Sequence, residues 1–304
     1  MKAAVEHLEE TFAFSERRAC RLIGLAPSTF RYQAIEKDDV LRGQLVKLAH
    51  ERPRFGYRRL HVLLRREGVN VNHKRVWRIY QEAGLSVKRK KRKRLVRTGR
   101  AQEAATTANE EWALDFISDA LATGRKLRVL SVVDTFTREC VALEADTSFA
   151  SRRVTRVLDN RIRERGRPHR IRCDNGPELT SRHFLSWCME NRIELCHIQP
   201  GKPTQNGYVE SFHGKLRDEF LNVSWFLNLF DARRKIKGWR RDYNEQRPHS
   251  ALGYLTPAAF AQQSAASSFA LLPERVAGEG PFSRERNPLT EMRTKEDFGL
   301  RGAT

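Results

Sequence analysis

The feature that most restricts the fold of this chain is a change of pattern near residue 109, from helical repeats to short strand-like runs. The segments EEWALDFISDA and KLRVLSVVDTFTRECVALEA are rich in β-branched and aromatic residues and predict three neighbouring strands. Helical and strand-like segments then alternate to about residue 245. This order predicts an α/β domain at residues 109–262, with a mixed five-stranded sheet and helices on both faces.

Helical signals dominate the first 85 residues. Residues 1–36 predict a short helix-turn-helix-like module, in which Ser15 caps a helix. Residues 38–85 predict an all-α DNA-binding domain whose third helix turns one apolar face inward. The outward side chains of that helix are basic and could enter a DNA major groove: Lys74, Arg75 and Arg78. An ordinary three-helix domain with a solvated basic face is the alternative.

The chain is strongly basic, with 57 Lys and Arg against 37 Asp and Glu and a formal net charge of +20. This charge predicts a polyanionic partner, foremost nucleic acid. A basic linker at 86–108 would add salt-sensitive affinity for phosphates, although a nuclear-localisation signal is the alternative for such a run. The consecutive basic residues of the linker are Lys88, Arg89, Lys90, Lys91, Arg92, Lys93 and Arg94.

Cysteine usage and hydropathy indicate the cellular compartment. The five cysteines form no CxxC pair and no zinc-finger spacing, which favours a reduced, intracellular protein. No segment has the roughly 18 uninterrupted apolar residues of a membrane span, and the N-terminus does not resemble a signal peptide. We therefore expect a cytoplasmic protein without a membrane partner. Residues 263–304 lack sustained periodicity and are predicted to be a disordered tail.

Three acids fall where a sheet domain can bring them together: Asp115 within the first strand, Asp174 at the end of the fourth, and Glu210 on a later helix. Two carboxylates about 4 Å apart repel by roughly 4 kcal/mol at an effective dielectric of about 20, so such a cluster requires a cation. Carboxylate oxygens favour Mg²⁺ or Mn²⁺. Two such ions would support in-line displacement at phosphorus without a protein nucleophile.

The segment around the third acid supplies candidate DNA contacts. The loop PGKPTQNG has the Gly and Pro content of a mobile segment that could close on a DNA strand. On the helix that follows, a basic residue two turns beyond Glu210 shares its face and could hold a phosphate. The candidates of this region are Lys202, Gln205, Asn206, Lys215 and Arg217.

The motifs around the three acids resemble a known superfamily. WALDF around Asp115, CDNGPE from Cys173, and PGKPTQNGYVESFHGKLRDEF around Glu210 resemble the core of DDE transposases and retroviral integrases. RPRFGYRRLHVLLRREG and YNEQRPHSALGYLTPAAF also resemble the OrfB-type transposases of insertion-sequence family three. The similarity covers nearly all of residues 15–262.

This resemblance implies a ribonuclease H-like catalytic fold with a D-D-35-E triad at Asp115, Asp174 and Glu210 and two divalent metal ions. It implies hydrolytic nicking at the ends of an insertion sequence and strand transfer by the freed 3′-hydroxyl. The implied DNA partners are double-stranded terminal inverted repeats and target DNA. The family often has a lysine where this chain has Arg217. Nothing matches the His/His/Cys/Cys zinc module of retroviral relatives, so no zinc is expected.

The resemblance also implies how such a protein assembles. A homo-oligomer would pair two element ends, and an upstream reading frame could contribute as a separate product or as a frameshift fusion. The expected location is the cytoplasm of a bacterium, in association with the nucleoid. Two rival functions stay open at this point. One is a ribonuclease H-like nuclease that cuts without joining, and the other is a non-catalytic DNA-binding regulator derived from a transposase.

Several further residues near these motifs have competing interpretations. A turn-capping role is favoured for Asp134 over a fourth metal ligand. Glu178 fits assistance to a metal-bound water and capping of a helix equally well. For His213 we expect a position on the helix surface without a ligand role, and for Trp112 we expect packing. Trp77 lies among basic residues, and its role stays open.

Overall fold

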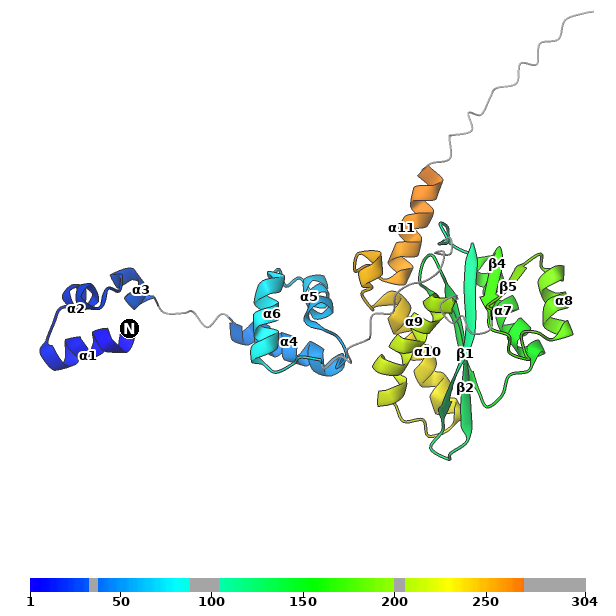
Figure 1. Cartoon of the computed structure of the whole chain (residues 1–304), viewed down its shortest axis with the longest axis horizontal. Helices are drawn as coiled ribbons and strands as arrows, with labels where there is room; N and C mark the ends of the chain where they lie inside the picture. Colours follow the sequence, from blue (N-terminus) through cyan, green and yellow to red (C-terminus); the bar gives the residue numbers. More distant parts are fainter. Residues whose placement is uncertain (33–37, 88–103, 200–205, 271–304) are drawn as a thin grey trace, which may run out of the picture.

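The computed structural model describes residues 1–32, 38–87, 104–199 and 206–270 (Figure 1). The first helices pack on one another around Val5, Ala19 and Cys20. Their bounds are α1 (Lys2–Phe12), α2 (Glu16–Ile23) and α3 (Pro27–Arg31). Ser15 stands at the N-cap position of α2, as predicted, but its side chain makes no capping hydrogen bond.

A second helical module follows, and we refer to it as the α4–α6 module. It consists of α4 (Asp38–Glu51), α5 (Tyr57–Arg66) and α6 (His73–Glu82). Val76, Ile79 and Tyr80 of α6 are buried against leucines of α4 and α5, which confirms the predicted inward face. Asn72 begins α6, because its side-chain oxygen accepts a hydrogen bond of 2.9 Å from the Lys74 backbone N–H.

The sheet domain contains five strands in the order β3-β2-β1-β4-β5. Their bounds are β1 (Glu111–Ala120), β2 (Lys126–Asp134), β3 (Cys140–Asp146), β4 (Arg170–Cys173) and β5 (Glu194–His197). β1, β2 and β3 pair antiparallel, whereas β4 pairs parallel to β1 and β5 pairs parallel to β4. The predicted mixed sheet of a ribonuclease H-like domain is therefore confirmed.

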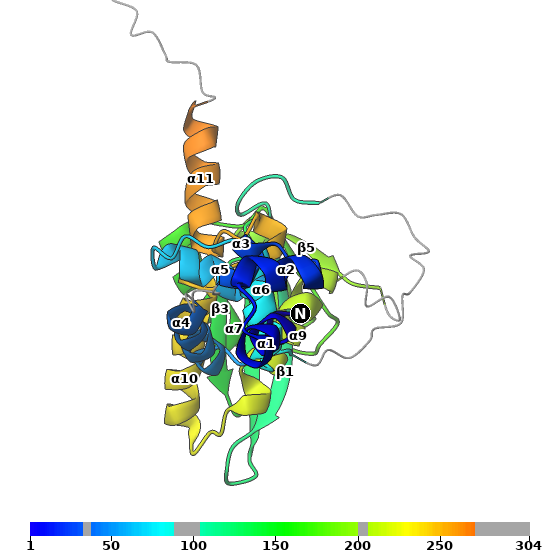
Figure 2. The same ribbon diagram turned by 90° about the vertical axis from the view of Figure 1, so that its left-hand side faces the viewer.

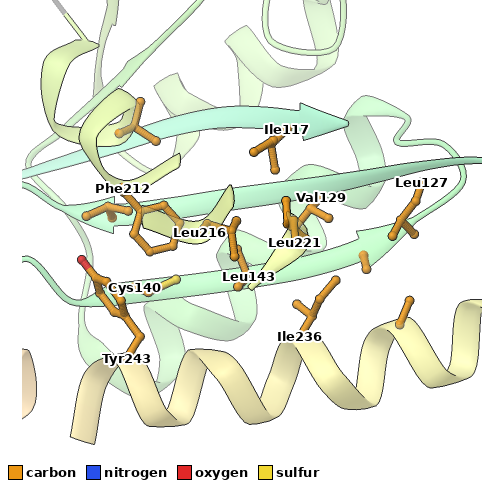
Figure 3. Packing of buried hydrophobic residues seen from close by; sticks show 14 of the residues in the cluster. Ile117, Leu127, Val129, Cys140, Leu143, Phe212, Leu216, Leu221, Ile236 and Tyr243 are labelled. Carbon is orange, nitrogen blue, oxygen red and sulfur yellow. The ribbon is translucent and has the colours of Figure 1, made fainter. Parts of the chain in front are cut away.

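Helices cover both faces of this sheet, and residues of β1 alternate between the two layers. Trp112 and Leu114 face the core beneath α7 (Ser151–Arg165) and α8 (Arg182–Glu190). Ala113 and Ile117 face α9 (Gly207–Glu219), η2 (Leu221–Val223) and α10 (Leu229–Glu245). Figure 3 shows this second layer, in which side chains of α9 and α10 meet the sheet. Because α9 packs along β1, it is held directly over that strand.

The described chain ends in η3 (Ser250–Leu252) and α11 (Pro257–Ala270). α11 projects from the sheet domain in both views (Figure 1, Figure 2). It extends to Ala270, which corrects the expectation that disorder begins at residue 263. The segment is rich in alanine, which favours a helix without an apolar stripe. No helix of the described residues combines the length and the apolar character that crossing a membrane requires.

Candidate active site

The parallel pairing of β1 with β4 makes two of the predicted acids neighbours. Leu114 of β1 stands opposite Cys173 of β4, so the next residues along the two strands are Asp115 and Asp174. Leu114 points into the core beneath α7 and α8. Since side chains alternate along a strand, Asp115 points to the opposite face, where α9 lies.

Helix α9 supplies the third acid, Glu210, from its exposed first turn. Burial raises the pKa of Asp115 to about 6, and the negative charges of Asp174 and Glu210 contribute to this shift. A hydrogen bond of 2.7 Å from the Phe116 backbone N–H acts in the opposite direction. The charges of Asp174 and Glu210 therefore act on Asp115, and we call Asp115, Asp174 and Glu210 the acidic cluster.

The turn after β4 depends on Gly176. Its backbone N–H donates to the Asp174 carboxylate over 3.2 Å. A Cβ at this glycine would lie 3.2 Å from both the Asp174 Oδ1 and the Glu178 Oε2. Any larger residue would therefore press on the Asp174 carboxylate and move it.

Two residues, Ser131 and His213, support Asp115. Sequence reasoning missed the first and wrongly expected the second on the helix surface. Ser131 is fully buried and pairs with Asp115 across β1 and β2. Its hydroxyl donates to the Asp115 carbonyl over 3.0 Å and lies 2.7 Å from His213 Nε2. His213 Nδ1 lies 3.6 Å from Asp115 Oδ2, with only 13% of the side chain exposed. The expected surface histidine is therefore engaged, because α9 lies flat on the sheet.

The charge state of His213 follows from its surroundings. Burial and the nearby charge of Arg217 lower the pKa of His213 to about 4. The ring is therefore neutral at pH 7 and does not balance the acidic cluster. A hydroxyl inside the otherwise apolar run VLSVV was the one sequence signal that could have identified Ser131.

The donor chemistry of the acidic cluster suits a hard divalent cation. Among the described residues, no ion pair reaches Asp174 or Glu210, so the cluster carries uncompensated negative charge. The described part of the chain also contains no group of three or more His, Cys, Asp or Glu side chains arranged closely enough to hold a metal ion. The residue types and the negative charge therefore fit a cation. The three carboxylates do not lie close enough together to form a complete set of ligands.

The candidate DNA contacts near α9 take different positions. Arg217 is exposed, and its Nη2 lies 3.5 Å from the Ser118 carbonyl beside β1. Lys215 is half-buried on another face of α9, where burial and Arg247 lower its pKa to about 8. Asn206 is 3% exposed at the N-cap of α9, and its Oδ1 has no hydrogen-bond partner among the described residues. Outside the described residues lie Lys202, Gln205 and the basic run Lys88–Arg94.

The basic face of α6 is partly balanced within its own module. Lys74 is exposed, and Trp77 beside it is 49% exposed. Arg75 donates from Nε to Asp38 over 2.6 Å, and Arg78 donates to the same carboxylate over 2.6 Å. The structure thus places all three predicted contacts on α6 but pairs the two arginines with α4.

Two competing interpretations are resolved, and the contact found for Glu178 favours neither of its two predicted roles. Asp134 is fully buried and accepts hydrogen bonds of 2.9 Å from the backbone N–H groups of the following turn, which confirms the capping role. Glu178 forms an ion pair with Arg128, whose guanidinium lies 4.3 Å from the Phe116 ring centroid. Trp112 is fully buried, which confirms packing.

Comparisons with known proteins agree with this architecture. The integrase core domain family matches residues 105–203 and again residues 191–257, and an HTH-like domain matches residues 36–93. The chain is 51% identical to the Insertion element IS407 uncharacterized 31.7 kDa protein of Burkholderia multivorans, over 86% of this chain and 95% of that protein. It is 29% identical to the Putative transposase InsK for insertion sequence element IS150 of Escherichia coli, over 78% of this chain and 90% of that protein.

One solved structure resembles part of the chain. The HTLV-2 integrase catalytic core domain in complex with magnesium is 20% identical and has a TM-score of 0.42. The match covers 51% of this chain and 97% of that one.

Proposed function

Because this chain belongs to the insertion-element transposases that carry an integrase core domain, we propose that Asp115, Asp174 and Glu210 form its catalytic centre. Transposition by polynucleotidyl transfer is the function of the family. The observation that supports the residue assignment is the register of β1 and β4, in which Asp115 and Asp174 each directly follow one residue of the pair Leu114 and Cys173.

The acidic cluster would hold divalent cations, Mg²⁺ or Mn²⁺, through carboxylate oxygens. When two are bound, such ions activate the attacking oxygen and stabilise the leaving oxygen at phosphorus. The chain supplies the fixed positions of the acids. Ser131 and His213 contact Asp115 on β1 and support its position. Gly176 leaves room for the Asp174 carboxylate. Arg217, exposed beside β1, is available to bind a phosphate.

The reaction consists of two in-line displacements at phosphorus. In the first, a water oxygen bonds to phosphorus at the element end while the bond to the 3′-oxygen breaks. In the second, that 3′-hydroxyl bonds to a phosphorus of target DNA, and a target 3′-oxygen leaves. Nucleophile and leaving group both come from water or DNA, so the protein needs no covalent nucleophile.

The helical modules would recognise the terminal inverted repeats. The exposed Lys74 and Trp77 of α6, together with Arg75 and Arg78, form the best candidate surface for a DNA groove. The basic run Lys88–Arg94 would add phosphate contacts and salt-dependent affinity. Two ends must meet for transposition, so we further propose a homo-oligomer, with an upstream-frame product or fusion as an additional component.

Strand transfer with purified full-length protein tests this assignment. The assay combines end-containing duplexes, target DNA and Mg²⁺, and compares wild type with Asp174→Asn and Glu210→Gln. We expect both variants to lose joining activity by about 10³-fold or more, because transition-state charge is no longer stabilised. Asp119→Asn is the matched control, since this acid lies on β1 outside the acidic cluster.

The products separate the rival functions. Wild-type protein should both nick and join, and all variants should bind end DNA equally. Cutting without joining would indicate a nuclease, and binding without either reaction would indicate a regulator. Equal joining by wild type and both cluster variants would refute the catalytic assignment.

A further inference from the structure

The end of α9 lies against the α4–α6 module, far from the acidic cluster on the same helix. Glu219, the last residue of α9, is nine residues beyond Glu210, a distance of about 14 Å along the axis. Nine residues also turn the helix by about half a revolution beyond two full turns. Glu210 and Glu219 therefore lie on opposite sides of α9.

Glu219 is enclosed by arginines from both domains. Arg247, which is only 2% exposed, donates to its carboxylate from Nε over 2.6 Å and from Nη2 over 2.5 Å. Arg59 of α5 donates from Nη1 to the same carboxylate over 3.0 Å. Phe55 of the α4–α6 module is 5% exposed, and the guanidinium carbons of Arg59 and Arg247 lie 5.2 Å and 5.9 Å from its ring centroid.

Two further ion pairs extend this contact. Arg52 of the module donates from Nη1 to Asp242 of α10 over 2.6 Å and contacts the second carboxylate oxygen as well. Arg54 forms an ion pair with Asp218 of α9. Both pairs are half-buried. Because Arg52 and Asp242 interact through two atoms on each side, their pair fixes the relative orientation of the two side chains as well as joining opposite charges.

Backbone carbonyls of the catalytic domain complete the surface. Arg66, at the end of α5, donates to the Gln246 carbonyl over 2.7 Å and to the Tyr254 carbonyl over 3.2 Å. We call these ionic and carbonyl contacts of Arg52, Arg54, Arg59 and Arg66 the dock. Figure 1 shows the module beside the α9 and α10 side of the sheet domain.

The dock and the proposed DNA surface use different parts of the module. The dock comes from the turn after α4 and from α5, whereas Lys74 and Trp77 of α6 remain exposed. Arg52, Arg54 and Arg59 of the dock form ion pairs with carboxylates of the catalytic domain. The module can therefore contact its own catalytic domain and DNA simultaneously.

We propose that the α4–α6 module docks on the catalytic domain of its own chain and holds α9 in place, with Arg54 and Arg59 as positioning residues for Glu210. This inference rests on the proposed role of Glu210. A helix is stiff, so support of its last turn limits the tilt of its first turn.

A charge-exchange series on Arg54 and Asp218 tests the proposal in full-length protein. This pair is exposed enough, at 35% and 48% of the side chains, that its reversal is compatible with folding. The single variants are Arg54→Asp and Asp218→Arg, and the third variant carries both changes. Arg59→Ala and its conservative counterpart Arg59→Lys form a second series. Arg42→Asp is the matched control, because Arg42 pairs with Glu82 inside the module.

Two quantities are measured for each variant: the dissociation constant for end DNA and the single-turnover joining rate at saturating DNA with Mg²⁺. We expect Arg54→Asp, Asp218→Arg and Arg59→Ala to lower the rate about 10- to 100-fold, the effect of a small displacement of a reacting group. Their dissociation constants should change less than about twofold. The double variant and Arg59→Lys should recover most of the rate, while Arg42→Asp should match wild type.

Several outcomes overturn the proposal. Unchanged rates in the single variants would show that the dock does not position α9. Parallel losses of DNA affinity would make these arginines DNA contacts, and absence of recovery in the double variant would remove the pairwise explanation. If an equimolar mixture of the two single variants regained activity, the dock would act between copies and not within one chain.

Failure of the proposed function itself gives a different result. In that case wild type would not join DNA, or Glu210→Gln would join as well as wild type. Failure of the dock alone leaves wild type active and Glu210→Gln inactive, with Arg54→Asp at the wild-type rate.

Discussion

The acidic cluster and the dock lie at opposite ends of α9 and treat charge in opposite ways. In the acidic cluster, the charges of Asp174 and Glu210 act on Asp115, and the neighbouring His213 is neutral at pH 7. In the dock, Arg59 binds the Glu219 carboxylate, which Arg247 of the same domain also binds, and Arg54 binds Asp218. The difference separates a surface without arginine partners, where we propose that a cation binds, from one that is balanced by its own side chains.

This contrast shows how two sets of acidic residues on one helix acquire different roles. A carboxylate with arginine partners has few remaining sites for a ligand, so it serves to hold domains together. Carboxylates without such partners retain their full affinity for a cation and carry the energetic cost of repulsion until one arrives. Removing a charge from the arginine–carboxylate contacts should therefore lower the free energy of unfolding, whereas removing a charge from the acidic cluster should raise it.

The largest effect on stability is expected from Arg247→Ala. This change removes a buried guanidinium and leaves Glu219 partly unpaired, so the free energy of unfolding should fall by about 3 to 5 kcal/mol. Guanidinium chloride unfolding of metal-free protein measures it. Arg247→Lys should lose less, because it keeps the charge. A loss below about 1 kcal/mol, as for exposed pairs, would mean that the pair of Arg247 and Glu219 is not a balanced buried contact.

Magnesium should stabilise the acidic cluster and leave the dock unaffected. At a concentration 100 times the dissociation constant, one bound ion raises the free energy of unfolding by about 2.7 kcal/mol. Thermal unfolding with MgCl₂ and with EDTA measures this difference. Asp174→Asn should abolish most of it, whereas Arg54→Asp should retain it. Equal stabilisation of wild type and Asp174→Asn would place the ion elsewhere.

Asp115→Asn should stabilise the metal-free protein while abolishing joining. The pKa of this carboxyl rises from 3.8 to about 6 on folding, so the native state binds more protons between these pH values. Ionised Asp115 therefore lowers stability progressively from about pH 4 to pH 6, and the full cost persists above pH 6. Allowing for the 23% exposure of the side chain, the gain at pH 7 is about 2 kcal/mol.

The pH profile supplies the control for Asp115→Asn. In EDTA, the stability difference between variant and wild type should grow between pH 4 and pH 6 and level off above that range. A difference that does not depend on pH would point to altered packing and contradict the charge-based account.

The smallest effect is expected from Arg42→Ala. The pair between Arg42 and Glu82 is about half exposed on both sides and belongs neither to the dock nor to the acidic cluster. Its removal should change the free energy of unfolding by less than about 1 kcal/mol, as measured by chemical denaturation. A change as large as that for Arg247→Ala would remove the distinction between balanced buried pairs and ordinary surface pairs.

Sequence patterns predicted the elements of the fold because local periodicity reports burial. The β-branched and aromatic residues around Asp115 predicted β1, and the spacing of Val76, Ile79 and Tyr80 predicted the inward face of α6. Helical geometry likewise put Arg217 on the Glu210 face. The same geometry would have separated Lys215 from that face, since five residues turn a helix by about 140° beyond one full turn.

Contacts between distant segments were not predictable in this way. Ser131 supports Asp115 only because of the register between β1 and β2, which a single sequence does not specify. Arg59 and Glu219 are 160 residues apart, and no local pattern links an arginine on one helix to a glutamate on another. His213 seemed to be a surface residue until the packing of α9 on the sheet was known.

The pairing of Leu114 with Cys173 has a consequence for the timing of activity. Asp115 meets Asp174 only after the chain has crossed the sheet through α7 and returned as β4, and Glu210 joins them only when α9 has been synthesised and packed. A nascent chain that ends before α9 therefore lacks the complete acidic cluster.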